Sequence, residues 1–588
     1  MRDLRYVWQR SSFGLLTRLF LRQFLENDAI SPDADRSQLL AVAGSLAMSL
    51  TLFLSFVMSA KYVSTWTPAG AAVASLDDKF LYLAFGMIVT ALVAATQWDT
   101  LSIDPRDAAI LEPLPVEAGT IRRAKLTAVA ILGGGVAIAV NLFPSFIFPW
   151  LLMFGFRQMS VAWLVPLVAA HFMVTVAAAG FGYLTVIAFR ETVALMLGAR
   201  AFGKASPWLQ GALIVVLGST LLLLPAAADG IAARGFDDRR AQTPPMWFLG
   251  VYETLAGGII ADLPRTVMTP RQVLQDRRAS VLYAERRGEF PALARRAAFA
   301  TAFTAALAAL AYWWRARRLP SLSPAAAPSF RRGWHGGARV ANALLLRDAA
   351  VRAGFYFALA AMWRNSTHRL TLACAAAGGF AMAVLALSNA MPGASGAVSV
   401  RLLWVQPLLF GALLVGFRHI IRVPAELRAN WGFQLAWGQR GDAFLTGVKA
   451  AAVLGLVVPA LIVVLPLFVY VLGASRAALH AGLGLAGAIL FLEIVLHGYD
   501  KVPFTCSYLP SENMKALAPI YAIAFIAGTA VFARMQHSAL HGGSPIRLVV
   551  ALAVVFAILR VITVKRPRQG LVDFDEAPVT FSALNLSS

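Results

Sequence analysis

Residues 450–473, AAAVLGLVVPALIVVLPLFVYVLG, carry no charged side chain. An α-helix rises 1.5 Å per residue, so about 20 apolar residues cross the ~30 Å hydrocarbon core of a bilayer. A water-soluble helix of this length keeps a polar face, and this run offers almost only aliphatic and aromatic side chains. We therefore predict that the segment spans a membrane.

The rest of the chain repeats this pattern, and we predict about twelve spanning helices, six in each half. Over 588 residues the chain is 59% hydrophobic and 14% charged, a composition outside the range of soluble proteins. The runs 402–417 and 548–564 are short and depend on Arg401 and Arg560 extending toward the headgroups. The twelve runs are 39–60, 80–98, 126–150, 161–189, 209–228, 297–314, 370–391, 402–417, 450–473, 477–496, 516–533 and 548–564.

The basic residues predict the orientation. The formal net charge is +22, but the basic residues lie in short clusters between apolar runs, where they mark cytoplasmic loops and not a nucleic-acid interface. Six arginines precede the first run, whereas Lys61 and Lys79 follow it, so both the N-terminus and the tail 565–588 are expected in the cytoplasm. The Arg-rich segment 229–296 then falls outside, as loops longer than about 60 residues can. The preference for Arg over Lys, with abundant Ala and Gly, favours a bacterial inner membrane.

Two amphipathic segments indicate an internal repeat. Residues 4–25 set arginines against leucines and phenylalanines, as in a helix that lies in the membrane interface, and residues 340–363 resemble them. The predicted organisation is an N-terminal cytoplasmic interfacial helix in 1–38, a six-helix membrane half in 39–314, a cytoplasmic linker with a second interfacial helix in 315–369, a second six-helix half in 370–564 and a cytoplasmic tail in 565–588.

Residues 104–125, DPRDAAILEPLPVEAGTIRRAK, form the loop between the second and third predicted spans. Pro113 and Pro115 stop any helix, because proline lacks an N–H and restricts the residue before it. We expect a rigid turn and then a short amphipathic helix, which Arg122, Arg123 and Lys125 would hold to anionic headgroups. Residues 423–449 form the equivalent loop of the second half. The plainer interpretation is an ordinary loop with positive-inside charges.

The PLPV turn at 113–116, with the basic residues that follow it, resembles the cytoplasmic loop of bacterial ABC exporter permeases. The resemblance implies a membrane-spanning exporter subunit, with two six-helix halves fused, that moves an unidentified substrate. It also implies a separate ATPase subunit as partner, so that ATP is bound there and this chain needs no cofactor. The residues expected to couple to the ATPase are Asp107, Glu112, Pro113, Leu114, Pro115, Arg122, Arg123, Lys125, Glu426, Arg428, Trp431 and Lys449.

The sequence offers no catalytic or metal motif. The nearest match to a phosphate-binding loop, GARAFGKA at 198–205, has Ala205 where Mg²⁺ needs a hydroxyl and follows an apolar run instead of a strand. His537 and His541 have helical spacing, but no glutamate follows His537. Cys374 and Cys506 are too few for a disulfide framework or a cysteine-based metal site. We therefore expect no enzymatic activity in this chain.

Two ionisable residues lie inside predicted spans, His171 in the fourth and Glu493 in the tenth. Such groups are costly in lipid and usually face a bundle interior or a water path, which makes both functional candidates. Alternatively, His171 makes an interhelical hydrogen bond and Glu493 reaches the headgroups from the end of its span. Residues 501–510 form either a second loop that faces the ATPase or a simple connector.

Two other protein classes stay open. A secondary transporter with 6+6 helices also uses repeats and buried charges, but the sequence shows no acidic cluster suited to coupling protons or sodium. A membrane enzyme of lipid or cell-wall metabolism would need paired carboxylates, a metal motif or a nucleophile with its base, and none is visible. An exporter permease is therefore the leading hypothesis.

Overall fold

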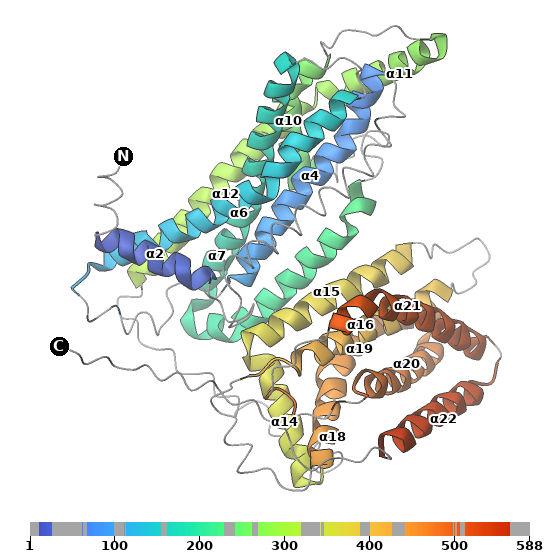
Figure 1. The fold of residues 1–588 in the computed structure, drawn as a ribbon. Coiled ribbons are helices and arrows are strands. Elements are labelled where there is room, and N and C mark those ends of the chain that lie inside the picture. Colours follow the sequence, from blue (N-terminus) through green and yellow to red (C-terminus); the bar gives the residue numbers. More distant parts are fainter. Residues whose placement is uncertain are drawn as a thin grey trace. The chain divides into compact units, whose positions relative to one another are not determined.

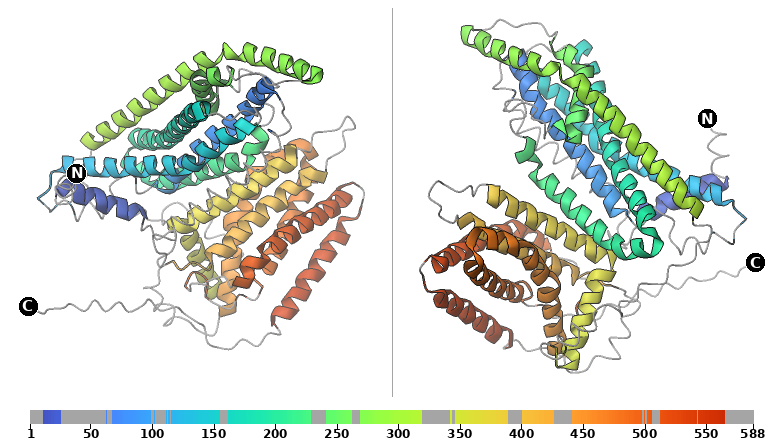
Figure 2. Two further views of the ribbon diagram at one scale, coloured as in Figure 1. Left: turned by 45° about the horizontal axis from the view of Figure 1, so that its top comes forward. Right: turned by 180° about the vertical axis from the view of Figure 1, so that it is seen from behind.

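All described secondary structure in the computed structural model is helical, and the chain divides into two compact units (Figure 1, Figure 2). Unit 1 is Met1–Pro328 and unit 2 is Ser329–Ser588, so their boundary lies within residues 315–369. The structure describes residues 11–25, 62, 67–98, 101, 111, 113, 115–154, 161–228, 241–261, 269–318, 342, 346–388, 400–425, 441–497, 499, 502–505, 512–541 and 543–564.

Within these residues, ten helices are long and apolar enough to cross a membrane. This confirms the prediction of an all-α, multi-pass membrane protein. Ten of the twelve predicted runs lie in these helices. The run 516–533 lies in α21 (Glu512–Leu540), which is not one of the ten, and the run 39–60 lies outside the described residues.

Unit 1 is built around α4 (Pro68–Thr96) and α7 (Val161–Ala228), which each contact most of the other helices of the unit. In α7, Gly198 turns the chain between two arms, Ala162–Gly198 and Ala201–Pro225, with φ +71°, a conformation that favours glycine. Its helices are α2 (Ser12–Leu25), α4 (Pro68–Thr96), α6 (Ala118–Phe154), α7 (Val161–Ala228), α10 (Pro244–Ala261), α11 (Pro270–Arg287) and α12 (Phe290–Arg318).

A close crossing holds the first arm of α7 against α4. A Cβ on Gly182 would overlap the backbone of Met87, so only glycine allows this approach. Beside it, the Thr90 hydroxyl donates a 2.6 Å hydrogen bond to the Ala179 carbonyl oxygen. Small residues and hydroxyl bonds are how helices associate in lipid, where burial of apolar surface gives little driving force.

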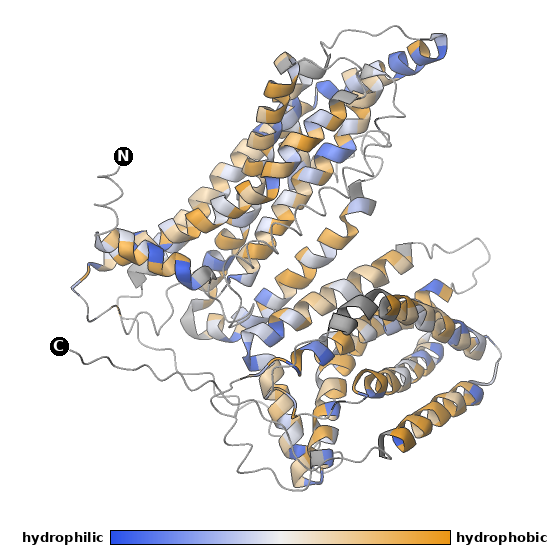
Figure 3. Ribbon diagram, in the orientation of Figure 1, coloured by the Kyte–Doolittle hydropathy of each residue, from blue (hydrophilic) through white to orange (hydrophobic). Residues whose placement is uncertain are grey.

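The segment 229–296, expected to connect two spans on the outside, is largely helical. It holds α10, α11 and the first turns of α12. The apolar helix α10 packs on α4, α7 and α12, and Gly250 lets it approach the α12 backbone near Leu293. In contrast, α11 is rich in charged residues, and Figure 3 shows its outer end in the hydrophilic colour. The segment therefore adds structure to the bundle and is more than a connection.

Unit 2 contains the second set of long apolar helices. The run 450–473 continues through three helical pieces, with a π-helical turn just before Pro459. Such a turn gives room next to a proline, whose ring clashes with the carbonyl four residues earlier. The helices are α14 (Ala349–Arg364), α15 (Ser366–Ser388), η1 (Val400–Trp404), α16 (Val405–Ile420), α18 (Gly441–Ala452), η3 (Val453–Val457), α19 (Val458–Leu472), α20 (Ala474–Val495), α21 and α22 (Pro545–Val564).

The two amphipathic segments occupy corresponding places in their units. In unit 1, α2 packs on α6, and in unit 2, α14 packs on α18. The second contact is very close, because a Cβ on Gly354 would overlap the Phe444 carbonyl and one on Gly447 would overlap the Val351 carbonyl. In each unit, an amphipathic helix is thus clamped to the helix that begins the third predicted span.

Candidate functional site

The proline turn of unit 1 is exposed where the structure describes it. Pro113 and Pro115 are exposed, and α6 begins three residues after Pro115. Leu111, just before the turn, is buried. The predicted coupling residues Asp107, Glu112 and Leu114 lie outside the described residues. The described part therefore presents a solvent-facing turn that leads straight into a long spanning helix.

The basic residues after the turn point in different directions. Arg123 is exposed and Arg122 is half-buried, as expected for groups that contact headgroups. Lys125 is 2% exposed: its Nζ lies 4.6 Å from the Phe20 ring centroid and donates to the Gln23 side chain at 3.4 Å. The expectation that Lys125 faces headgroups is therefore wrong. The residues that contact Lys125, Phe20 and Gln23, belong to α2. The spacing of residues along the sequence does not show that α2 packs against this part of α6.

In unit 2, two residues predicted separately come together. The Lys449 ammonium, at the end of α18, lies 2.6 Å from a carboxylate oxygen of Glu493 in α20. Arg560 of α22 lies 3.9 Å from the other oxygen, and the Lys449 and Glu493 side chains are 16% and 12% exposed. Glu493 is thus a mostly buried ion-pair residue that joins three helices. The predicted residues Glu426, Arg428 and Trp431 lie outside the described residues.

Two loops of unit 2 meet at one end of the bundle. The Phe504 amide donates to the Ile421 carbonyl at 2.9 Å, and the Ala425 amide donates to the Phe504 carbonyl at 2.8 Å. Phe504 is buried against the rings of Phe357 and His368, and has φ +65°. The described part of 501–510 is therefore docked on the end of α16 and is not a loose connector.

His171 lies in an aromatic cluster inside unit 1. Its Nδ1 is 3.3 Å from the Tyr252 hydroxyl of α10, which matches the interhelical hydrogen bond considered from the sequence. Its ring also contacts Tyr82 of α4 and Phe148 of α6, and its Nε2 is buried with no hydrogen-bond partner in the described part of the chain. The side chain is fully buried, so it faces the bundle interior and not lipid.

A buried ion pair next to this cluster escaped the sequence analysis. Lys79 of α4 lies 2.5 Å from Glu253 of α10, and both side chains are 0% exposed. The Tyr283 hydroxyl of α11 donates to the other oxygen of Glu253, and the Tyr62 hydroxyl donates to Asp78, each at 2.5 Å. One signal was present, since Glu253 stands alone in the apolar run 246–261, but that run lay inside a presumed external loop.

The network shifts the acidity of its phenols. Burial raises the pKa of Tyr283 well above its usual value of 10.0, and the Glu253 carboxylate raises it further, because a phenolate beside a carboxylate is unfavourable. Burial and Asp78 likewise raise the pKa of Tyr62. Both phenols therefore stay protonated and act as hydrogen-bond donors. Each donates to a buried carboxylate oxygen, and a buried polar group is costly in a water-poor site without such hydrogen bonds.

The remaining sequence motifs carry no site. The glycine-rich stretch 198–205 forms the bend and the start of the second arm of α7. His537 lies in the last turn of α21, and its ring stacks on that of His541 at 4.1 Å. No group of three or more metal-ligating side chains is found within the residues that the structure describes. None of these stretches assembles a catalytic constellation there.

No protein-family model, curated protein or solved structure matches this chain.

Proposed function

We propose that the chain is the membrane-spanning permease subunit of a bacterial ABC exporter, with two six-helix halves and with both termini in the cytoplasm. A separate ATPase would hydrolyse ATP, and the substrate would pass between helices of this chain. The observation that carries the proposal is the repeated clamp: α2 on α6 and α14 on α18. In each unit, the clamped helix follows a predicted coupling loop.

The clamp supports the proposal mechanically. A force on the exposed turn at Pro113 and Pro115 would reach α6 at its first residues, where α2 holds it. Since α6 has 37 residues, it extends about 55 Å at 1.5 Å per residue, enough to carry a displacement across the bilayer. In unit 1 the buried Lys125 contacts Phe20 of α2 and so joins the two clamped helices, and in unit 2 Lys449 ties the clamped helix α18 to α20 through Glu493.

The test is recovery of the partner. The tagged full chain is purified in mild detergent from its native membrane at modest salt, and bound proteins are identified by mass spectrometry. We expect a P-loop ATPase with the wild type, and much less of it with Pro115→Gly combined with Arg122→Glu. Arg278→Glu, an exposed position on α11 at the other end of unit 1, is the control. Equal ATPase recovery from the double variant would rule out this coupling turn.

One observation favours a second candidate, an ion-coupled secondary transporter. The buried ion pair of Lys79 and Glu253, which the sequence did not show, lies near Asp78 and near His171, and buried ionisable groups in membrane helices mark ion and proton paths. Vesicles that contain the purified chain and a pH-sensitive dye, without ATP, would test it. Proton movement that Glu253→Gln abolishes would place this candidate first.

A further inference from the structure

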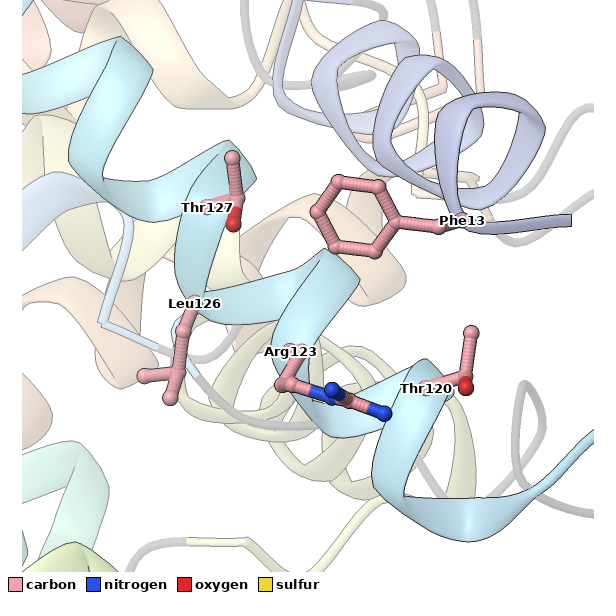
Figure 4. A pocket seen from close by; sticks show the side chains of 5 residues that line it. All are labelled: Phe13, Thr120, Arg123, Leu126 and Thr127. Carbon is pink, nitrogen blue, oxygen red and sulfur yellow. The ribbon is translucent and has the colours of Figure 1, made fainter. Parts of the chain in front are cut away.

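A depression lies between α2 and the first turns of α6 (Figure 4). Its volume is about 530 Å³, and it is lined by Phe13, Thr120, Arg123, Leu126 and Thr127. Figure 4 shows the Phe13 ring extending from α2 toward α6, where the other four side chains are placed. The depression therefore exists only because the amphipathic helix is clamped to the spanning helix.

The depression has an apolar part and a polar part. Phe13 and the 44% exposed Leu126 supply hydrocarbon surface. Thr120 and Thr127 supply hydroxyls, and Arg123 supplies a guanidinium. The Arg123 Nε donates to the Gly119 carbonyl at 3.3 Å, which orients the guanidinium along the helix start. A guanidinium is suited to a phosphate because its planar N–H groups match the phosphate oxygens. The ligand that fits both parts is an amphiphile with an anionic head.

The surroundings reinforce this selectivity. Arg18 and Arg22 of α2 are exposed, and Leu15 and Leu19 of the same helix are more than half exposed. Neither α2 nor α6 contains an acidic residue, and in the sequence Glu26 follows α2 and Glu117 precedes α6. Arginines interleaved with exposed leucines are typical of a helix at the headgroup boundary, where basic pockets bind anionic lipid heads.

We infer that this depression is a binding site for an anionic phospholipid. The phosphate contacts Arg123 and Thr120, and an acyl chain lies against Phe13 and Leu126. The occupant thereby joins α2 to α6 and strengthens the clamp. The inference depends neither on the proposed transport function nor on which leaflet the depression faces. It follows from charge complementarity, from the mixed lining and from the position of the depression beside an interfacial helix.

Native mass spectrometry of the detergent-purified full chain tests the inference. The chain is titrated with dioleoylphosphatidylglycerol or dioleoylphosphatidylcholine, and bound lipid is counted. We expect the anionic lipid to bind more tightly, and Arg123→Gln to weaken its binding about fivefold, the factor that one basic residue contributes near an anionic surface. Arg278→Gln removes the same charge from α11 and should leave binding unchanged. If both variants weaken binding equally, the attraction is diffuse and the site is refuted.

Two further measurements address the acyl chain. Thr127→Trp should fill the depression and reduce phosphatidylglycerol binding while Arg123 stays in place, and thermal unfolding of this variant checks that it is folded. Inorganic phosphate at the same concentration as the lipid should not displace the lipid, because it lacks the apolar contact. Wild-type lipid binding by Thr127→Trp, or displacement by phosphate alone, would overturn the proposed site.

Discussion

The two units bury a histidine against a phenylalanine at the same point in their helix order. In unit 1, His171 of the fourth predicted span contacts Phe148 of the third, with ring centroids 5.0 Å apart. In unit 2, His480 of the tenth contacts Phe468 of the ninth, at 4.5 Å. All four side chains are buried. The correspondence supports the internal repeat with a contact that the loop sequences did not reveal.

The surroundings of the two histidines differ in charge. The ion pair of Lys79 and Glu253 lies next to His171. His480 of α20 lies instead beside the uncharged side chain of Gln536. A second amide side chain, that of Gln406, contacts Gly484, which lies one turn after His480 in α20. Unit 1 has α10 and α11 to cover its site, while only four residues separate α21 from α22 in unit 2. An ionised pair needs extra hydrogen bonds and exclusion from lipid. The ion pair therefore occurs in unit 1, where α10 and α11 supply both.

The largest effect should come from breaking the ion pair of unit 1. Glu253→Ala leaves the Lys79 ammonium buried without its carboxylate, and we expect the free energy of unfolding to fall by about 3–5 kcal/mol. Thermal or denaturant unfolding in detergent measures this. The double variant Lys79→Met with Glu253→Leu should recover most of the loss, because it removes both charges. A double variant as unstable as the single one would contradict this account.

The next effect concerns Tyr283, the α11 donor to Glu253. Tyr283→Phe should cost about 1.5–3 kcal/mol, the usual contribution of a hydrogen bond to a charged group. The sign of the pH dependence follows from the raised pKa of the phenol: its contribution is complete below pH 10.0, the unfolded value, and is lost as the pH rises toward the higher folded value. The difference in melting temperature between wild type and variant should therefore shrink above pH 10.0. A difference in melting temperature that grows above pH 10.0 would contradict the assignment of Tyr283 as a hydrogen-bond donor to Glu253.

One added methyl group should weaken the contact between α14 and α18, the clamp of unit 2. A Cβ on Gly447 would overlap the Val351 carbonyl, so Gly447→Ala should separate α14 from α18 and cost about 1–3 kcal/mol. Gly378→Ala in α15 is the matched control, because nothing lies within 4 Å of the added Cβ; it should be neutral or stabilising, since alanine favours helix. Equal effects of the two substitutions would show that the close crossing is unimportant.

The smallest effect should come from the ion pair of unit 2. Lys449 and Glu493 are partly exposed and Arg560 lies near the same carboxylate, so water and a second cation compensate when Lys449 is removed. We expect Lys449→Met to cost about 1 kcal/mol or less, as for pairs near a surface, and to lose its effect at high salt. A loss of unfolding free energy as large as that of Glu253→Ala would show that the two ion pairs are equally shielded from water.

The sequence by itself determined where most of the long apolar helices lie. Long uncharged runs can satisfy their backbone only as helices in lipid, so 126–150 and 450–473 were predictable from composition alone. The basic residues Lys125 and Lys449, which directly precede these two runs, were also visible in the sequence. Their partners were not, because hydropathy reports how a segment divides between water and lipid and says nothing about which helices meet.

Only the tertiary structure decided the candidate sites. Lys79 and Glu253 are 174 residues apart, and Lys449 and Glu493 are 44 apart, so no periodic pattern connects them. From the sequence, Lys79 was assigned to an external loop. In the structure, α10 places the Glu253 carboxylate next to it. Two charged residues can be buried in a membrane helix bundle when packing brings them together at ion-pair distance and supplies additional hydrogen bonds, as it does for Lys79 and Glu253.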